Sequence, residues 1–259
     1  MTNASGSSKR AALRAAQELE AKRKRTNRIM IAVASVVGVL IIALVGVILV
    51  QSLGKNSQAQ ITPANATADY GIQAYPGKAK PDALKVVIWE DFQCPWCKFT
   101  SDAYSKQLHS LAESGDIALE YKLVSFLDSR LPGDASHRAA MGATIADGFG
   151  KFTAYTDEVY ANQPQTEGQG YPNALLRDTI PAKIGLTGDD LAKFQAQYDG
   201  KATDTFVTET NKLAATQQVP GTPYITVNGK EVGLLDSSRT PLAGTTPESL
   251  LAYLKAHAA

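Results

Sequence analysis

The two cysteines of this 259-residue chain stand together as Cys94-Pro95-Trp96-Cys97. The apolar run Val86-Val87-Ile88-Trp89 before them predicts a buried strand, and the polar residues after them have helical spacing. A cysteine pair at such a strand-to-helix turn is a common setting for thiol–disulfide exchange. The sequence therefore indicates redox chemistry at this turn.

The position of Cys94 favours it as the nucleophile. Cys94 opens the predicted helix, where free backbone N–H groups and the helix dipole stabilise a thiolate. Pro95 follows at the first helical position, where its missing N–H has no cost. Cys97 lies one turn inside the helix, so we expect it to be more buried and less acidic, and to act as the resolving thiol that releases a mixed disulfide.

Other roles for the cysteine pair have less support. A structural disulfide across so short a loop would stabilise the fold by about 2 kcal/mol, near the low end for disulfides. A structural zinc site needs four ligands, whereas the chain has two thiols, and its histidines (His109, His137, His257) are scattered without ligand spacing. We therefore expect no metal and no cofactor at this turn.

The N-terminal region predicts a membrane anchor. Residues 1–28 contain eight Lys and Arg residues against Glu18 and Glu20, a charge of +6, and the 22 residues 29–50 contain no charged residue. At 1.5 Å per residue, a helix over 29–50 would span about 33 Å, enough for a bilayer core. The basic residues before this transmembrane helix predict a cytoplasmic N-terminus and place the rest of the chain outside the membrane. A cleavable signal peptide is the alternative, although its apolar region is usually shorter.

The rest of the chain is acidic, with a net charge of −5, because the whole chain carries +1. An acidic domain gives no electrostatic reason to expect nucleic-acid binding. Residues 51–69 are polar, contain Gly, Ser and Asn, and have no periodicity, which predicts a linker. A folded domain is therefore expected over residues 70–259.

Strands and helices alternate in the expected domain. Strands are predicted at residues 85–91, 117–126, 224–227 and 230–235, with Asn228-Gly229 as a two-residue hairpin turn between the last two. Helices are predicted at residues 95–113, 135–149, 151–162, 172–183, 188–198 and 203–217, and a last helix opens at Thr246-Pro247. The first strand–helix–strand unit predicts a parallel pair with a right-handed crossover, and the hairpin adds antiparallel strands.

A second motif, Val219-Pro220-Gly221-Thr222-Pro223, directly precedes the strand predicted at residues 224–227. A plain turn accounts for Pro220-Gly221. Pro223 has no N–H to donate to a sheet, and a cis bond between Thr222 and Pro223 would suit its position.

Two motifs together resemble the DsbA-like branch of the thioredoxin superfamily. They are Trp89-Glu90-Asp91-Phe92-Gln93-Cys94-Pro95-Trp96-Cys97 and Gly221-Thr222-Pro223-Tyr224-Ile225-Thr226-Val227-Asn228-Gly229. Ser136-His137-Arg138-Ala139-Ala140 and Gly150-Lys151-Phe152 resemble parts of that family's helical insertion. The resemblance covers about residues 70–257. It implies an α/β thioredoxin fold with an inserted helical domain at about residues 128–217, here preceded by a single transmembrane helix.

The resemblance also implies residues that bind substrate and tune the redox chemistry. Pro223 would be the cis-proline packed against the Cys94–Cys97 disulfide. Thr222 would hold the substrate peptide through backbone contacts and would tune the redox poise, as would Pro95 and Trp96 between the cysteines. Trp96 stands where the best-known oxidases carry a histidine, and it cannot offer a positive charge to the thiolate.

One position departs from the family's pattern. Members commonly have a buried acidic residue six positions before the first cysteine, which relays protons to the resolving thiol. That position is Ile88 in this chain, and Glu90 and Asp91 occupy other positions on the predicted strand. The resemblance therefore does not imply a carboxylate relay here, and water would serve instead.

These features predict a membrane-anchored thiol–disulfide oxidoreductase that introduces disulfide bonds into reduced exported proteins. A quinone-coupled membrane oxidase of the DsbB or vitamin-K-epoxide-reductase (VKOR)-like kind would reoxidise it, and the protein would act as a monomer. A reductase or isomerase of the same fold is the nearest alternative, although isomerases usually dimerise through a separate N-terminal domain. A non-catalytic tethered binding module and a metallochaperone are further alternatives, and the second would need another metal-binding cluster.

Overall fold

The computed structural model describes Met30 and residues 59–258. The predicted cytoplasmic tail, nearly all of the predicted transmembrane helix and the first part of the predicted linker lie outside these residues. In the part of the chain that is described, no helix has the length and apolar character needed to cross a membrane.

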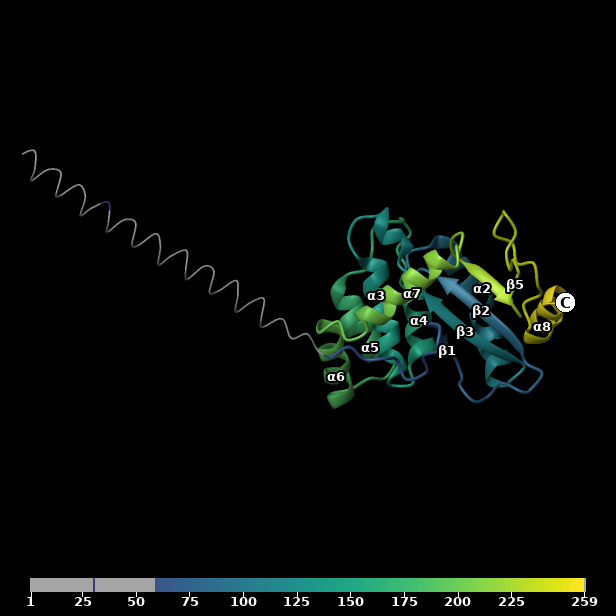
Figure 1. Ribbon diagram of the computed structural model, residues 1–259, viewed down its shortest axis with the longest axis horizontal. Coiled ribbons are helices and arrows are strands. Elements are labelled where there is room, and N and C mark those ends of the chain that lie inside the picture. The colour runs from purple at the N-terminus through teal and green to yellow at the C-terminus, as the bar shows by residue number, and fades with distance from the viewer. Residues whose placement is uncertain (1–29, 31–58, 259) are drawn as a thin grey trace, which may run out of the picture. The chain divides into compact units, whose positions relative to one another are not determined.

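The described residues form a five-stranded mixed sheet in the order β1-β3-β2-β4-β5. Its strands are β1 (Ile72–Gln73), β2 (Leu84–Glu90), β3 (Ile117–Leu123), β4 (Tyr224–Val227) and β5 (Lys230–Glu231). Strands β2 and β3 are parallel, whereas the pairs β1–β3, β2–β4 and β4–β5 are antiparallel. Helix α2 (Pro95–Glu113) connects the two parallel strands, which confirms the predicted strand–helix–strand unit (Figure 1).

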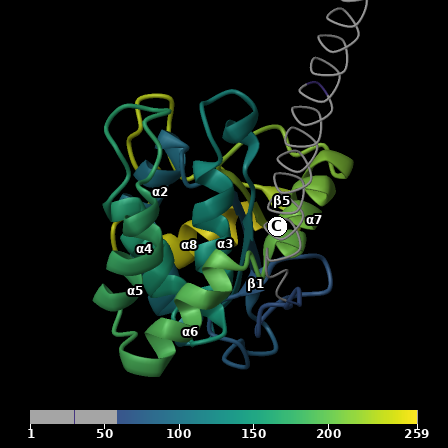
Figure 2. The ribbon, with the colours of Figure 1, turned by 90° about the vertical axis from the view of Figure 1, so that its left-hand side faces the viewer.

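Helical segments occupy the chain between β3 and β4. They are η1 (Phe126–Ser129), α3 (Ala135–Asp147), α4 (Phe152–Ala161), η2 (Leu175–Thr179), α5 (Ile180–Lys183), α6 (Gly188–Asp199) and α7 (Asp204–Thr216). Figure 1 shows α3, α5 and α6 grouped on one side of the sheet, away from the last helix, α8 (Pro247–Ala258), and Figure 2 views this group from its own side. The arrangement is the α/β thioredoxin fold with inserted helices that the sequence predicted.

The two faces of β2 pack against different parts of the domain. Ile88 belongs to the main core, which also contains buried residues of α2 and α8. Trp89 belongs to a smaller cluster with Ala214 of α7. Because side chains alternate along a strand, Glu90 at the end of β2 lies on the same face as Ile88.

Two predicted strands are shorter in the structure. The strand predicted over residues 230–235 ends at Glu231. Beyond it, Leu234 accepts a backbone hydrogen bond from Leu242, and Leu235 forms an isolated bridge with Pro241. The segment thus leaves the hairpin, while Leu234 packs into the core. The strand predicted over residues 117–126 ends at Leu123, since η1 begins at Phe126.

The folded unit includes residues that the sequence assigned to the linker. Gln60 donates to the carbonyl of Lys201 at 3.0 Å and accepts from the N–H of Thr205 at 2.8 Å. Asn65 donates from both its backbone and its side chain to the carboxylate of Asp147, at 2.7 and 2.8 Å. Polar side chains that looked like linker residues therefore satisfy polar groups of the inserted helices, and the folded unit begins before residue 70.

Candidate active site

Strand β2 and helix α2 position the two cysteines. Cys94 is the residue directly before α2 and has an extended backbone, with φ −73° and ψ 119°, while Pro95 lies in the first turn of the helix. The backbone N–H groups of Trp96 and Cys97 interact with the sulfur of Cys94. The turn thus has the geometry that the sequence indicated for a stabilised thiolate.

A buried carboxylate shapes the turn between β2 and α2. Asp91 accepts hydrogen bonds from the backbone N–H groups of Gln93 at 2.9 Å and Leu127 at 3.0 Å, and from the hydroxyl of Ser136 at 2.5 Å. Leu127 and Ser136 belong to η1 and α3. Asp91 therefore ties the reactive turn to the inserted helices.

Two side chains from the insertion satisfy the carbonyl groups of the same turn. Gln163 donates to the carbonyl oxygens of Phe92 at 2.7 Å and Cys94 at 3.1 Å. The hydroxyl of Tyr171 also donates to the carbonyl of Phe92, at 2.5 Å. Sequence analysis missed Gln163 and Tyr171, because no local pattern connects them to a turn about 70 positions earlier in the chain.

The two thiols differ strongly in acidity. Both cysteines are free thiols, and 6% of Cys94 and 2% of Cys97 is exposed. A hydrogen bond from Cys97, together with the side chain of Thr222 and the helix N–H groups, lowers the pKa of Cys94 to about 7 against the opposing effect of burial. Burial raises the pKa of Cys97 well above its ordinary value. Cys94 is thus poised to ionise near neutral pH, while Cys97 keeps its proton.

The second predicted motif lies against the cysteines. The peptide bond between Thr222 and Pro223 is cis, as the resemblance to the DsbA-like branch implied. The carbonyl oxygen of Thr222 accepts a hydrogen bond from the sulfur of Cys94 at 3.2 Å. Pro223 lines a small cavity together with Cys97. The structure therefore brings all the predicted site residues together: Cys94, Pro95, Trp96, Cys97, Thr222 and Pro223.

Two open cavities meet at this site. The larger, of about 840 Å³, is lined by Cys94, Trp96 and Thr222 and by residues of η1 and α7. The smaller, of about 330 Å³, is lined by Trp96, Thr222, Pro223 and the segment after β4. Trp96 and Thr222 border both cavities, so a bound peptide that covers Cys94 can extend into either one.

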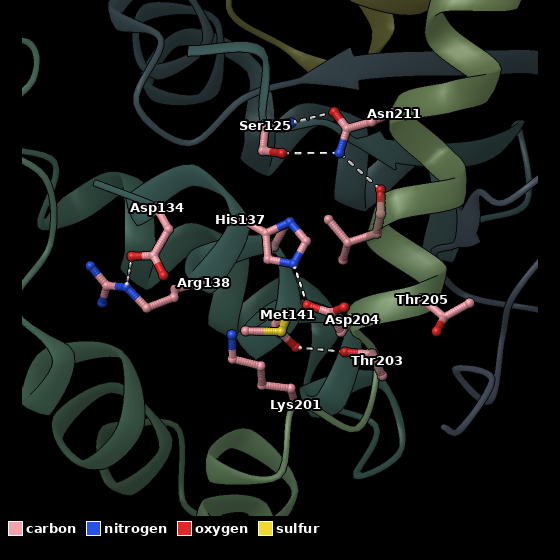
Figure 3. Close-up of polar contacts among 12 residues, drawn as sticks. Ser125, Asp134, His137, Arg138, Met141, Lys201, Thr203, Asp204, Thr205 and Asn211 are labelled. Atoms are coloured by element: carbon pink, nitrogen blue, oxygen red, sulfur yellow. Dashed lines mark hydrogen bonds and ion pairs between the residues drawn. The ribbon is translucent and has the colours of Figure 1, made fainter. Parts of the chain in front are cut away.

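Polar contacts fix the wall of the larger cavity. Asn211 of α7 accepts from the N–H of Ser125 at 2.8 Å and donates to its hydroxyl at 2.9 Å. Nε2 of His137 lies 2.9 Å from the carboxylate of Asp204, and Figure 3 shows the other ring nitrogen of His137 on the side of Ser125 and Asn211. These contacts hold α3, α7 and the segment after β3 together at the wall of the cavity.

The carboxyl group of Glu90, to which the sequence analysis assigned no role, lines the same small cavity as Cys97. Glu90 is 5% exposed, and its Oε1 has no hydrogen-bond partner among the described residues. It lines, with Cys97, Asp157 and Tyr160, a cavity of about 20 Å³, which has room for one water molecule. Burial raises the pKa of Glu90 to about 8 and that of Asp157 to about 6.

Glu90 could have been identified from the strand pattern. It stands two residues after Ile88, where the family commonly has its acidic relay, and alternation along β2 puts both side chains on one face. Asp157 lies on α4, and no pattern in the sequence connects it to the turn.

In the described part of the chain, no group of three or more His, Cys, Asp and Glu residues has an arrangement that could hold a metal ion. The histidines have other contacts. His109 lies 3.3 Å from the hydroxyl of Tyr121, and His257 lies 2.8 Å from the carbonyl of Tyr253.

Comparisons with known proteins agree with this architecture. A family described as thioredoxin matches residues 77–251, more than half of the chain. MdbA, a thiol-disulfide oxidoreductase from Corynebacterium diphtheriae, is 22% identical, with 68% of this chain and 89% of that chain covered and a TM-score of 0.54. Reduced DsbA from Mycobacterium tuberculosis is 23% identical, with 72% and 91% covered and a TM-score of 0.54.

MdbA, a thiol-disulfide oxidoreductase from Actinomyces oris, is 16% identical, with 77% of this chain and 91% of that chain covered and a TM-score of 0.60. No curated protein matches the chain. At these identities the likeness to the solved structures is one of fold. The match over residues 77–251 shows that this chain belongs to the thioredoxin family.

Proposed function

We propose that the protein is an extracytoplasmic thiol–disulfide oxidoreductase that introduces disulfide bonds into exported proteins. The difference in acidity between Cys94 and Cys97 carries the proposal. A thiol with a pKa of about 7 is stable as a thiolate in the reduced protein and is a good leaving group when a substrate is released. Both properties make Cys94 the thiol that exchanges with the substrate. Because thioredoxin also has a reactive thiol with a pKa of about 7, the reduction potential of the pair decides the direction of transfer. The thiol-disulfide oxidoreductases of the same fold support this assignment.

The reaction begins with the Cys94–Cys97 disulfide. A substrate thiolate attacks the sulfur of Cys94, the bond between Cys94 and Cys97 breaks, and Cys97 leaves with the electron pair. A second substrate thiolate then attacks the substrate sulfur of the mixed disulfide and displaces Cys94 as a thiolate. The substrate dithiol loses two electrons and becomes a disulfide, while the cysteine pair becomes reduced.

Glu90 supplies the proton that Cys97 needs when it leaves. With a pKa of about 8, Glu90 is largely protonated at neutral pH, and it lines the same small cavity as Cys97. Since burial makes the Cys97 thiolate unfavourable, a nearby acid lowers the barrier to its departure. Asp157, in the same cavity and 43% exposed in its side chain, connects this acid to solvent.

Reoxidation requires a membrane partner in this proposal. A quinone-coupled oxidase of the DsbB- or VKOR-like kind would take the two electrons from the reduced pair. Residues 29–50 would hold the domain at the lipid bilayer on the outer side, where disulfides persist. The protein would act there as a monomer.

The test uses full-length protein purified in a non-ionic detergent. The oxidised protein should oxidise a reduced two-cysteine peptide, and Cys94→Ala should abolish this activity. A reduction potential well above the roughly −270 mV of thioredoxin would support an oxidase, whereas a lower potential with reduced thiols in cells would indicate a reductase. If the oxidised protein does not transfer its disulfide, or if Cys94→Ala retains the activity, the proposal is wrong.

A further inference from the structure

An arginine lies over the reactive turn without a carboxylate partner. The guanidinium of Arg239 is 4.4 Å from the ring centroid of Phe99 and 5.3 Å from that of Trp96, both on the first turns of α2. Among the described residues, the ion pairs do not include Arg239. Trp96 itself brings no charge to the turn, but its face holds a cation beside it.

The loop around Arg239 holds this side chain in place. The carboxylate of Asp236 accepts from the N–H groups of Ser238 at 2.8 Å and Thr240 at 2.9 Å, and its carbonyl accepts from the N–H of Arg239 at 2.9 Å. Arg239 has φ +66°, a left-handed backbone conformation. This conformation is unfavourable for residues with a side chain and is adopted readily by glycine. A strained arginine that points its cation at the reactive turn fits a role in recognition better than one in folding.

Arg239 lies close to the path that a peptide bonded to Cys94 would follow. Trp96 and Thr222 border both open cavities, and the smaller cavity is also lined by Asp236 and Ser237, which stand three and two residues before Arg239 in the same turn. A peptide bonded to Cys94 that leaves across Trp96 therefore passes the guanidinium within a few residues of its own cysteine.

The charged residues that line the smaller cavity are two carboxylates, whereas Arg130, Glu167 and Lys212 line the larger one. Glu231 and Asp236 line the smaller cavity, and Asp236 is held by the backbone of its turn. The guanidinium of Arg239 contacts the rings of Trp96 and Phe99, and among the described residues it forms no ion pair with either carboxylate. A guanidinium forms two parallel hydrogen bonds with a carboxylate, a geometry that a lysine cannot copy.

We propose that Arg239 binds a carboxylate next to the reacting cysteine of the substrate, so that clients with Asp or Glu within a few residues of that cysteine are oxidised fastest. This inference rests on the proposed function, since it names the substrate class of the same site.

The experiment compares peptides that differ in one side chain. Reduced two-cysteine peptides carry Glu, Gln or Lys at positions flanking the reacting cysteine, on either side, and kcat/KM is measured with the oxidised full-length protein. We expect a preference of about fivefold for Glu over Lys, the size of a partly exposed charge contact, and a decrease of this preference in high salt. Arg239→Gln and Arg239→Gly should remove the preference and leave the rate with the Gln peptide within about twofold of the wild type.

Three further variants and measurements separate recognition from structure. Arg239→Lys should recover only part of the preference. Arg239→Gly should retain the thermal stability of the wild type, because glycine adopts φ +66° without strain. Lys193→Gln removes another stacked cation, 5.8 Å from the ring of Phe149 in the insertion, and should keep the full preference.

The outcomes are distinct. If the wild type oxidises the Gln peptide but shows no preference for Glu, or if Arg239→Gln keeps the preference, the inference is overturned and the proposed function stands. If no peptide is oxidised, the proposed function fails. In that case the inference is tested by a binding assay, in which tryptophan fluorescence monitors the binding of peptides that have serine in place of cysteine. Tighter binding of the Glu peptide that depends on Arg239 supports it, and equal binding overturns it.

Discussion

Replacing Glu90 with glutamine should stabilise the protein at neutral pH, because this carboxylate is buried without a compensating charge. Burial raises its pKa from 4.5 to about 8. A group whose pKa is raised in the folded state gives full stability below its unfolded pKa, and that stability is lost as the pH rises toward the folded value. At 1.36 kcal/mol per pH unit, the loss is about 3 kcal/mol at pH 7 and about 5 kcal/mol above pH 8.

The assay is urea denaturation of the reduced protein between pH 5 and pH 9. Glu90→Gln should gain less than about 1 kcal/mol at pH 5 and about 3 kcal/mol at pH 7. Glu120 provides a matched control, because it is equally buried but lies 3.5 Å from the ammonium groups of both Lys85 and Lys122. Glu120→Gln should destabilise the protein by about 1–3 kcal/mol at pH 7. A gain for Glu90→Gln that is the same at pH 5 and pH 7, or no gain at all, would refute the reasoning.

The same substitution should slow disulfide transfer. Without an acid beside it, Cys97 must leave as a buried thiolate, so the rate of mixed-disulfide formation should decrease by about 10²-fold or more. Stopped-flow measurement against pH distinguishes this role from a structural one. The wild-type rate should fall as Glu90 ionises near pH 8, and the variant should lack this inflection. An unchanged pH profile would exclude Glu90 as the proton donor.

Three further predictions concern the turn itself. The absorbance of the reduced protein at 240 nm should report a thiolate that forms near pH 7 and disappears in Cys94→Ala, while Cys97→Ala should raise the pKa of Cys94 because it removes the main donor to that sulfur. Asp91→Ala should lower the free energy of unfolding by about 3 kcal/mol in urea denaturation, since it leaves three buried donors unpaired, and an effect below about 1 kcal/mol would contradict this. Gln163→Ala should cost about 1–2 kcal/mol in the same assay, and a neutral result would show that the carbonyls of the turn find other donors.

Features determined by neighbouring residues could be predicted from the sequence. Helix α2 has the predicted bounds, Pro95–Glu113, because a proline opens it and Gly115, with φ +81°, follows its end. The Asn228-Gly229 turn is present with both residues at positive φ, as a two-residue hairpin requires. The return strand after it was predicted too long, because apolar residues that pack into the core have the same pattern as residues that continue a strand.

The part of the site that could not be predicted comes from long-range contacts. A turn that leaves a sheet and opens a helix has backbone groups that neither element satisfies, and burial makes each unpaired group costly. In this protein the inserted helices supply the missing partners: Ser136 for Asp91, and Gln163 for the carbonyl of Cys94. The insertion therefore does more than cover the cysteines. It holds the turn in the conformation in which helix N–H groups reach the sulfur of Cys94, so the acidity of that thiol depends on residues far outside the Cys-Pro-Trp-Cys sequence.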